Sequence, residues 1–144
     1  MLKLRNGKPI EKYLLEQAMD DSDLSNAYFL NTRTGEVVCL SGYDTPDERE
    51  KLSEEIDGSS DYTRIDRIES SEAYQWMVDF IDSIVTPKDE QAAEKLSIAI
   101  MGKGAFRRFK DVLYVLGDEW EQQWYHWRDE RLQEAMDEWL ESVL

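Results

Sequence analysis

The segment NAYFLNTRTGEVVCLSG, residues 26–42, constrains the fold of this 144-residue chain more than any other stretch. Both of its arms are rich in β-branched and aromatic residues, which favour strands. The connection NTRTG fits a type I turn followed by Gly35 in the left-handed region, and the Asn31 side chain can cap that turn. We therefore predict a β-hairpin that closes with a bulge at Gly35.

Helical patterns occupy most of the remaining chain. Pro9 stands where the first turn of a helix tolerates proline. Two other helices begin with a Thr-Pro pair, in which Thr45 or Thr86 caps the helix and the proline occupies its first turn. The predicted helices cover about 9–20, 46–57, from Ser70 or Ser71 to Ile84, from the Thr86 cap to the glycine at 102, 105–116, and from an Asp118 cap with Glu121 as its box partner to about 142.

The apolar spacing predicts which face of each later helix points into the core. In the helix after Ser70, these residues are Tyr74, Met77, Val78, Ile81 and Ile84. In the helix after Thr86, they are Ala92, Leu96, Ala99 and Ile100. In the helix over 105–116, they are Ala105, Phe106, Phe109, Val112, Leu113 and Leu116, with Arg107, Arg108, Lys110 and Asp111 on the exposed face.

These elements predict an α+β protein, in which a β-hairpin packs against a helical C-terminal half. The segment DYTRIDRI, residues 61–68, is interpreted as extended, and it adds a third short antiparallel strand if it joins the hairpin. We find no internal repeat and no low-complexity linker. A single domain over 1–144 is predicted, with a hairpin-containing front over 1–60 and a helical back over 70–144.

The last predicted helix has two apolar stripes rather than one. Trp120, Trp124, Trp127, Arg131 and Ala135 share the first stripe, and Leu132, Met136, Trp139 and Val143 share the second. Because the stripes differ by roughly a quarter turn, the helix either bends or packs on different partners along its length. Arg131 follows Trp127 by four residues and Arg128 follows Trp124 by four, a spacing that allows cation–π contact.

The charge of the chain restricts its partners. Seventeen basic and 32 acidic residues give a net charge of −15, which opposes binding to nucleic acids or anionic membranes in general. No apolar run reaches the roughly 20 residues that a transmembrane helix needs, and the N-terminus lacks the apolar region of a signal peptide. The single cysteine, Cys39, excludes an internal disulfide and favours a reducing compartment, the cytoplasm.

The segment GKGAFRRFKDVL, residues 102–113, is the densest group of cations in this acidic chain. Gly104 opens a helix, and a helix N-terminus flanked by Lys103, Arg107 and Arg108 suits an anion. The segment is not a Walker motif, because the required glycine and lysine spacing is absent. In the alternative interpretation, the arginines pair with carboxylates of the protein itself, such as Asp111, Asp129 or Glu130.

Other candidate chemistry is weakly supported. The segment DDSDLSN has alternating carboxylates but lacks the glycine and glutamate of a calcium loop, so a solvated helix end is favoured. One histidine and one cysteine cannot form a zinc site of the usual kind. Cys39 is predicted as a buried small side chain in a strand and His126 as an exposed residue, so a catalytic pair is not expected. We therefore predict no catalytic residue, no metal and no cofactor.

Several segments resemble one known family. GKGAFRRFKDVL followed by EWEQQWYHWRDERLQEAMDEWLE is similar to the signature of UPF0158, a bacterial family of unknown function. YFLNTRTGEVV and EAYQWMVDFI also resemble its strand, turn, strand and aromatic helix. The resemblance covers about residues 24–142 and implies a bacterial cytoplasmic protein, and it implies no activity.

These observations favour a small non-catalytic protein that binds another protein or an anionic ligand. The predicted binding residues are basic or aromatic and belong to the last two helices: Lys103, Arg107, Arg108, Lys110, Trp124, Trp127, Arg128 and Arg131. In this hypothesis the arginines hold an acidic or phosphorylated group, and the tryptophans anchor an apolar one. Two alternatives stay open: the same cations bind RNA or DNA phosphates, or the acidic front half mimics nucleic acid and binds a basic protein.

Overall fold

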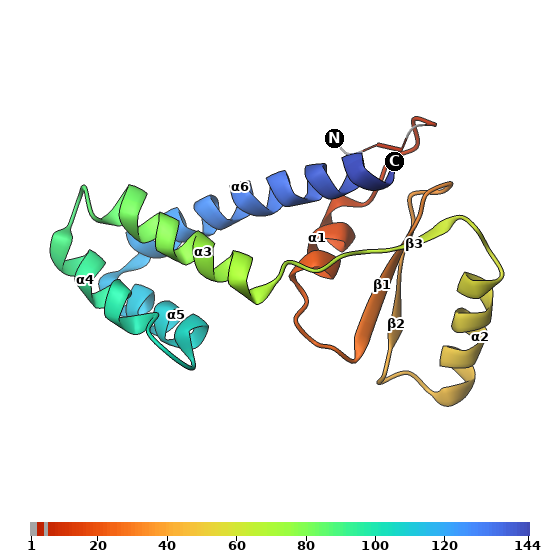
Figure 1. The fold of residues 1–144 in the computed structure, drawn as a ribbon, viewed down its shortest axis with the longest axis horizontal. Helices are drawn as coiled ribbons and strands as arrows, with labels where there is room; N and C mark the ends of the chain where they lie inside the picture. The colour runs from red at the N-terminus through yellow and green to blue at the C-terminus, as the bar shows by residue number, and fades with distance from the viewer. Residues whose placement is uncertain (1–2, 5) are drawn as a thin grey trace. The chain divides into compact units, whose positions relative to one another are not determined.

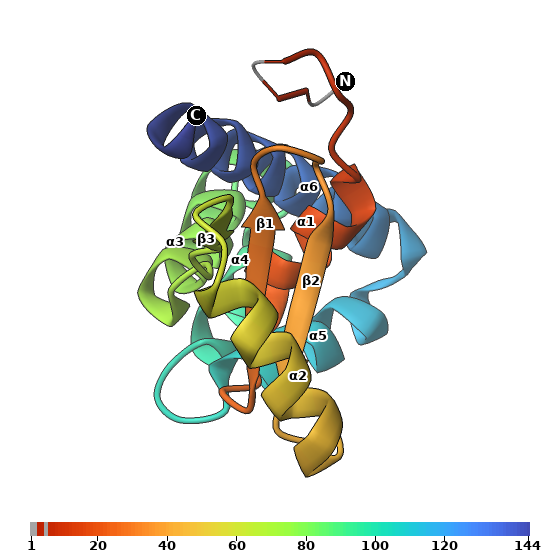
Figure 2. The same cartoon turned by 90° about the vertical axis from the view of Figure 1, so that its right-hand side faces the viewer.

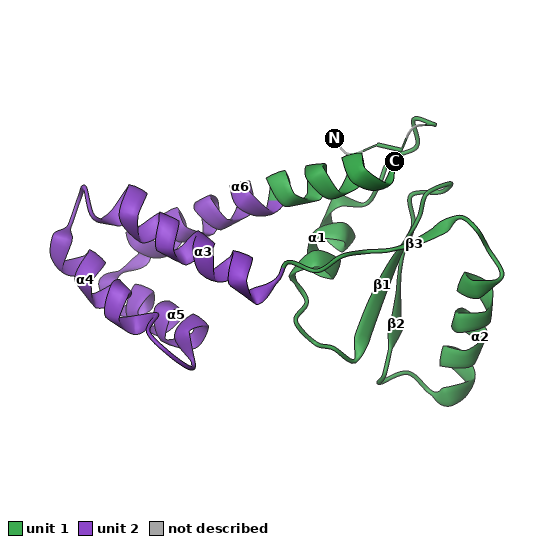
Figure 3. Ribbon diagram, in the orientation of Figure 1, with its two compact units in different colours: residues 1–68, 133–144 green, residues 69–132 purple. Residues whose placement is uncertain are grey.

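The computed structural model describes residues 3–4 and 6–144 and divides the chain into two compact units (Figure 3). Unit 1 comprises residues 1–68 and 133–144, and unit 2 comprises residues 69–132. The architecture is α+β, as predicted, with one antiparallel sheet and a helical C-terminal half (Figure 1). The prediction of a single domain over 1–144 remains a prediction.

The predicted hairpin is confirmed in unit 1. The sheet has the order β2-β1-β3 and consists of β1 (Asn26–Asn31), β2 (Val37–Ser41) and β3 (Tyr62–Arg64). Its short third strand comes from the segment that was predicted to be extended. At the hairpin turn, the Asn31 side-chain oxygen accepts hydrogen bonds from the N–H groups of Arg33 and Thr34, at 2.9 and 3.1 Å.

Gly35 ends this turn with a φ of +81°, as the bulge requires. A Cβ atom at this position would also lie 2.3 Å from the backbone oxygen of Pro9. The glycine is therefore needed twice, once for its conformation and once because another segment of unit 1 passes against it.

Two helices lie on opposite faces of the sheet, α1 (Lys12–Asp20) and α2 (Pro46–Asp57) (Figures 1 and 2). The start of α2 is confirmed, because the Thr45 hydroxyl oxygen accepts a hydrogen bond from the N–H of Glu48 at 3.3 Å. The predicted start of α1 at Pro9 is wrong. Pro9 instead pairs with Lys3 in an isolated bridge, which delays the helix to Lys12.

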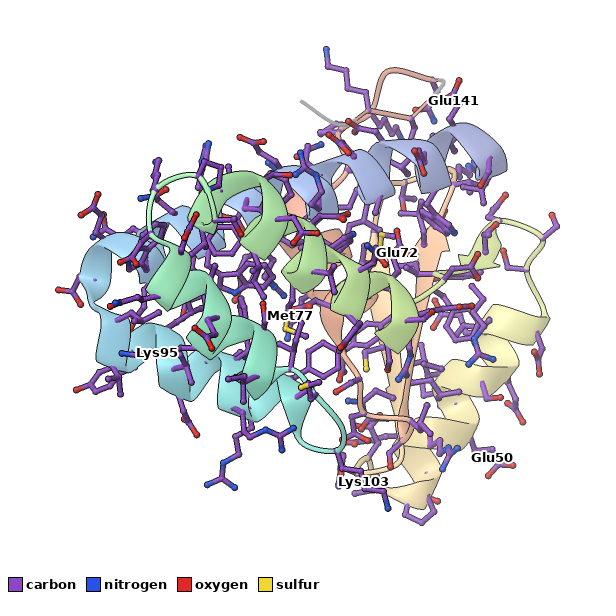
Figure 4. All side chains as sticks on the ribbon, turned by 60° about the vertical axis from the view of Figure 1, so that its left-hand side comes forward. Glu50, Glu72, Met77, Lys95, Lys103 and Glu141 are labelled. Atoms are coloured by element: carbon purple, nitrogen blue, oxygen red, sulfur yellow. The ribbon has the colours of Figure 1, made fainter. Side chains whose placement is uncertain are left out.

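Unit 2 is built from helices around a cluster of aromatic side chains. Phe80, Phe109 and Trp124 pack edge to face, with centroid distances of 4.8 Å between Phe109 and Trp124, 5.3 Å between Phe80 and Trp124, and 6.4 Å between the phenylalanines. Met77 points from helix α3 (Ser70–Phe80) into the same interior (Figure 4). The helices are α3 (Ser70–Phe80), the π-helical η1 (Ile81–Val85), α4 (Glu90–Ala99), α5 (Ala105–Leu116) and the first part of α6 (Asp118–Val143).

The predicted inward face of α3 is only partly correct. The buried residues of α3 and η1 are Trp76, Met77, Phe80, Ile81 and Val85, whereas Tyr74, Val78 and Ile84 are half-buried. The π turn widens the helix after Phe80 and thereby rotates the side chains that follow, so that Val85 points inward instead of Ile84. Glu69 is the N-cap residue of α3 and its side chain makes no capping hydrogen bond, so the predicted cap at Ser70 or Ser71 is wrong.

The start of α4 also differs from the prediction. Asp89, and not Thr86, caps the helix by accepting hydrogen bonds from the N–H groups of Gln91 and Ala92, both at 3.1 Å. The Thr86 hydroxyl instead donates to the carbonyl of Ile81 at 2.9 Å and closes the π turn. The predicted inward face is confirmed, since the following four side chains are buried: Ala92, Leu96, Ala99 and Ile100.

Helix α6 contributes residues to both units, because unit 2 ends at Leu132 and the residues after it belong to unit 1. Its buried residues are Trp124 and Leu132 in the unit 2 part and Met136, Trp139 and Leu140 in the unit 1 part, so the second predicted stripe begins in unit 2. We predicted that this helix either bends or packs on different partners along its length, and the division between the two units supports the second alternative. The helix begins at Asp118 itself, which places this residue in the first turn and not at the cap.

Candidate functional site

The loop between α4 and α5 is held by the side chain of Arg108. The guanidinium Nε donates to the carbonyl of Ala99 at 2.8 Å. Its Nη1 and Nη2 atoms donate to the carbonyls of Lys103 and Met101. The prediction that Arg108 belongs to an exposed basic face is therefore wrong, because its guanidinium donates hydrogen bonds to backbone carbonyls.

This contact explains why glycines and arginines occur together in GKGAFRR. Gly102 and Gly104 have φ values of +75° and +78°, which turn the chain sharply between the two helices. Arg108 then reaches back from the first turns of α5 and satisfies carbonyls that the end of α4 and the loop leave without partners. A Cβ atom on Gly104 would lie 3.0 Å from the Nη1 atom of Arg108, so glycine also makes room for the guanidinium.

The other three cations of this segment face solvent. Lys103, Arg107 and Lys110 are exposed, and none has an ion pair or side-chain hydrogen bond with the part of the chain that the structure describes. Figure 4 shows Lys103 on the loop between α4 and α5. The predicted pairing of Arg107 with an internal carboxylate is therefore not observed among those residues.

Aromatic side chains lie beside these cations. Phe106, Lys110 and Tyr114 follow one another at four-residue spacing on α5, and the exposed fractions of Phe106 and Tyr114 are 43% and 77%. The prediction that Phe106 points into the core is wrong, because the buried stripe passes through Ala105, Phe109 and Leu113. We call Lys103, Phe106, Arg107, Lys110 and Tyr114 the α5 face.

The predicted tryptophan anchors lie mainly inside unit 2. Trp124 is 6% exposed and belongs to the aromatic core, so it is not available to a partner. Trp127 is half-buried, and its indole N–H donates to the carbonyl of Trp76 at 3.0 Å. The guanidinium carbon of Arg131 lies 4.0 Å from the centroid of Trp127, which confirms the predicted cation–π pair. The pair of Arg128 with Trp124 remains a prediction.

A pocket of about 410 Å³ opens on the first half of α6, within unit 2. His126 is exposed, as predicted, and its Nε2 lies 2.6 Å from the carboxylate of Glu130. Glu130 is also 3.6 Å from Arg131. The residues that line the pocket are Ile84, Glu119, Gln122, Gln123, His126, Trp127 and Glu130. Sequence reasoning missed this site, although its α6 residues recur at helical spacing.

The acidic segment before the hairpin has a structural role. Asp21 accepts hydrogen bonds from the Tyr28 hydroxyl at 2.6 Å and from the Asn26 side chain at 2.9 Å. The hydrogen bond from Tyr28, and after it the one from Asn26, lowers the pKa of Asp21. Burial, and after it the hydrogen bond to Asp21, raises the pKa of Tyr28. Among residues 3–4 and 6–144, no group of histidine, cysteine or carboxylate side chains could hold a metal ion.

Cys39 lies opposite Tyr28 in the sheet. Its side chain is half-buried rather than fully buried as predicted. Burial raises the pKa of the Cys39 thiol, which keeps it protonated and therefore a poor nucleophile at neutral pH.

The fold and these surfaces define an α+β protein with a cationic, partly apolar helix face and a separate pocket on α6. The sequence profile of an uncharacterised protein family, UPF0158, matches residues 8–143, and the chain belongs to this family. Neither the curated proteins nor the solved structures contain a match to this chain. Within its described residues, the structure has no helix long and apolar enough to cross a membrane.

Proposed function

We propose that this protein is a non-catalytic interaction module of the bacterial cytoplasm, and that its α5 face binds an acidic segment of a partner protein. The observation that carries the proposal is the grouping of exposed aromatic side chains with exposed cations on one short helix. Phe106 and Tyr114 are exposed beside Lys110, although the chain as a whole has a net charge of −15. Exposed apolar surface rimmed by charged groups is typical of protein interfaces.

The residues of the α5 face have separate roles in this proposal. Phe106 and Tyr114 supply apolar contact area at a low cost in side-chain entropy. Arg107 binds a carboxylate or phosphate through two parallel hydrogen bonds, and Lys103 and Lys110 attract the partner electrostatically. Arg108 does not touch the partner, but it keeps the loop that carries Lys103 in place.

Two further exposed apolar side chains, Ile98 and Met101, lie at the end of α4 and in the loop that leads to α5. Their side chains are 61% and 69% exposed, and the Met101 carbonyl is one of those held by Arg108. A partner large enough to cover these side chains together with the α5 face would bury more apolar surface, which favours a folded protein surface or an amphipathic helix over an isolated anion.

A protein partner is favoured over a nucleic acid because of the charge balance. The α5 face has three exposed cations, whereas the whole chain has 15 more acidic than basic residues. Binding to a phosphate backbone gains most of its free energy from many cations acting together, and a strongly negative molecule repels that backbone. An acidic protein segment needs fewer cations, since apolar contacts contribute the rest.

The test compares two charge reversals that change the net charge equally. Tagged wild type, Arg107→Glu/Lys110→Glu and the control Lys51→Glu/Lys95→Glu are incubated with bacterial lysate, with and without nuclease, after circular dichroism has verified their helicity. Both control lysines are exposed helical residues outside the α5 face. We expect wild type and the control to retain a partner protein both with and without nuclease. Arg107→Glu/Lys110→Glu should lose this partner protein. Equal loss from both variants, or loss on nuclease treatment, would refute the proposal.

A further inference from the structure

We infer that the pocket on α6 is a binding site for an alkylammonium group, the chemical group shared by a lysine side chain and a polyamine. This inference is independent of the α5 face, because it rests on other residues and on the opposite charge. It assigns a ligand class to the pocket of about 410 Å³, which lies within the size range of small-molecule sites.

The arrangement of the lining fits a ligand with an apolar stem and a cationic head. Ile84 and Trp127 supply apolar surface for the stem. Two glutamates and two glutamines of the lining present carboxylate or amide oxygens, which accept the three N–H bonds of an ammonium group. They lie on one face of α6 at helical spacing, and so converge on one opening: Glu119, Gln122, Gln123 and Glu130.

The charges around the pocket favour a cation. Glu119 is exposed, and its side chain has no ion pair or hydrogen bond with the residues that the structure describes. Glu130 is shared between His126 at 2.6 Å and Arg131 at 3.6 Å, so its charge is partly balanced. Glu119 therefore provides the main uncompensated charge, and the net charge of −15 adds a long-range attraction for cations.

The chain itself already places an ammonium group against this lining. The Lys88 Nζ donates to the side-chain oxygen of Gln123 at 3.2 Å. Lys88 does not line the pocket, so this contact marks its edge and leaves the interior open. A second ammonium group that enters beside Glu119 would use the remaining oxygens in the same way.

The experiment uses n-butylammonium as the probe and n-butanol as its uncharged control. The full-length ¹⁵N-labelled protein is titrated by NMR in physiological salt, and the side-chain amide signals of the two lining glutamines and the indole signal of Trp127 are followed. We expect saturable shifts with n-butylammonium and much smaller shifts with n-butanol. In Glu119→Gln, affinity should fall by about threefold, as for an exposed ion pair, whereas Glu94→Gln, an exposed carboxylate of α4, should bind like wild type.

Two results would overturn the inference: equal weakening in Glu119→Gln and Glu94→Gln, or equal shifts with n-butanol and n-butylammonium. The first would mean that only net charge matters, and the second that the ammonium group is not recognised. Titration with spermidine and with a blocked Gly-Lys-Gly peptide then distinguishes the sources. Tighter binding of spermidine assigns the site to a free polyamine, and tighter binding of the peptide assigns it to a lysine of a partner protein.

Discussion

Two turns of this protein, one in each unit, place glycine at a positive φ, but side chains of opposite chemistry stabilise them. In the hairpin turn, Asn31 accepts hydrogen bonds from N–H groups two and three residues further along the chain. In the loop between α4 and α5, Arg108 donates to carbonyls five, seven and nine residues back. The first turn is thus specified within its own residues, whereas the second depends on a side chain from the helix that follows it.

The two glycines, Gly35 and Gly104, also differ in how rigid their neighbouring atoms are. Gly35 lies against the backbone of Pro9, which cannot move aside without shifting a segment of unit 1. Gly104 lies against the tip of a long, flexible side chain. A rigid neighbour should make substitution more costly than a flexible one, although the φ values of +81° and +78° are nearly the same.

Replacing each glycine by alanine tests this difference and gives the largest expected effect. Gly35→Ala should lower the free energy of unfolding by about 3 kcal/mol, because the strain of the left-handed backbone adds to the contact with Pro9. Gly104→Ala should lower it by about 1 kcal/mol, since mainly the backbone strain remains. Urea unfolding followed by circular dichroism measures both values. Equal losses would show that backbone conformation alone decides the cost.

Removing the Arg108 guanidinium tests how the second turn is held. Arg108→Met should cost about 2 kcal/mol in urea unfolding, because three carbonyls lose their donor and solvent replaces the donor only in part. Arg107→Met should change stability by no more than about 0.5 kcal/mol, since Arg107 is exposed. Amide hydrogen exchange should also rise across residues 100–104 in Arg108→Met alone. Unchanged exchange there would mean that the glycines hold the loop without Arg108.

The separation of the contacting residues along the chain explains which features could be predicted from the sequence. Asn31, Gly35 and the Thr45 cap act over two to four residues, and all three were predicted correctly. Arg108 was predicted to be exposed, because helical periodicity describes which face a residue occupies and not where a long side chain bends. The cation–π contact of Arg131 could be predicted, since both partners lie on one helix four residues apart.

Two other differences arise where local signals compete. Thr86 and Asp89 are both good caps, and the π turn after Phe80 decides between them by engaging the Thr86 hydroxyl. No spacing of residues in the sequence predicts the π turn. The pocket on α6 escaped prediction for another reason: its polar residues match an ordinary solvated helix face, and the fold brings Ile84 to them from η1.

The segment before the hairpin provides a titratable counterpart of the Asn31 turn and the smallest expected effect. The Asp21 carboxylate accepts from the N–H of Asp23 at 2.8 Å, as Asn31 accepts from that of Arg33. Because the bonds from Tyr28, Asn26 and Asp23 lower the pKa of Asp21, the unfolded chain binds this proton at a higher pH than the folded protein. The stability that Asp21 contributes is therefore complete above about pH 4 and is lost as the pH falls toward the lower, folded pKa.

Tyr28→Phe removes the largest cause of this shift and should make the free energy of unfolding fall less steeply below about pH 4. Tyr74→Phe is the matched control, because its hydroxyl donates to the carbonyl of Ile100, which does not titrate. Urea unfolding at several pH values between about 2.5 and 7 compares the two slopes with that of wild type. If both variants keep the slope of the wild type, the bond from Tyr28 does not tune Asp21, and Asp21 holds its turn through the Asp23 N–H and Asn26 alone. Asp21 and Asn31 would then differ only in charge, and the acid sensitivity of unit 1 would have to come from other carboxylates.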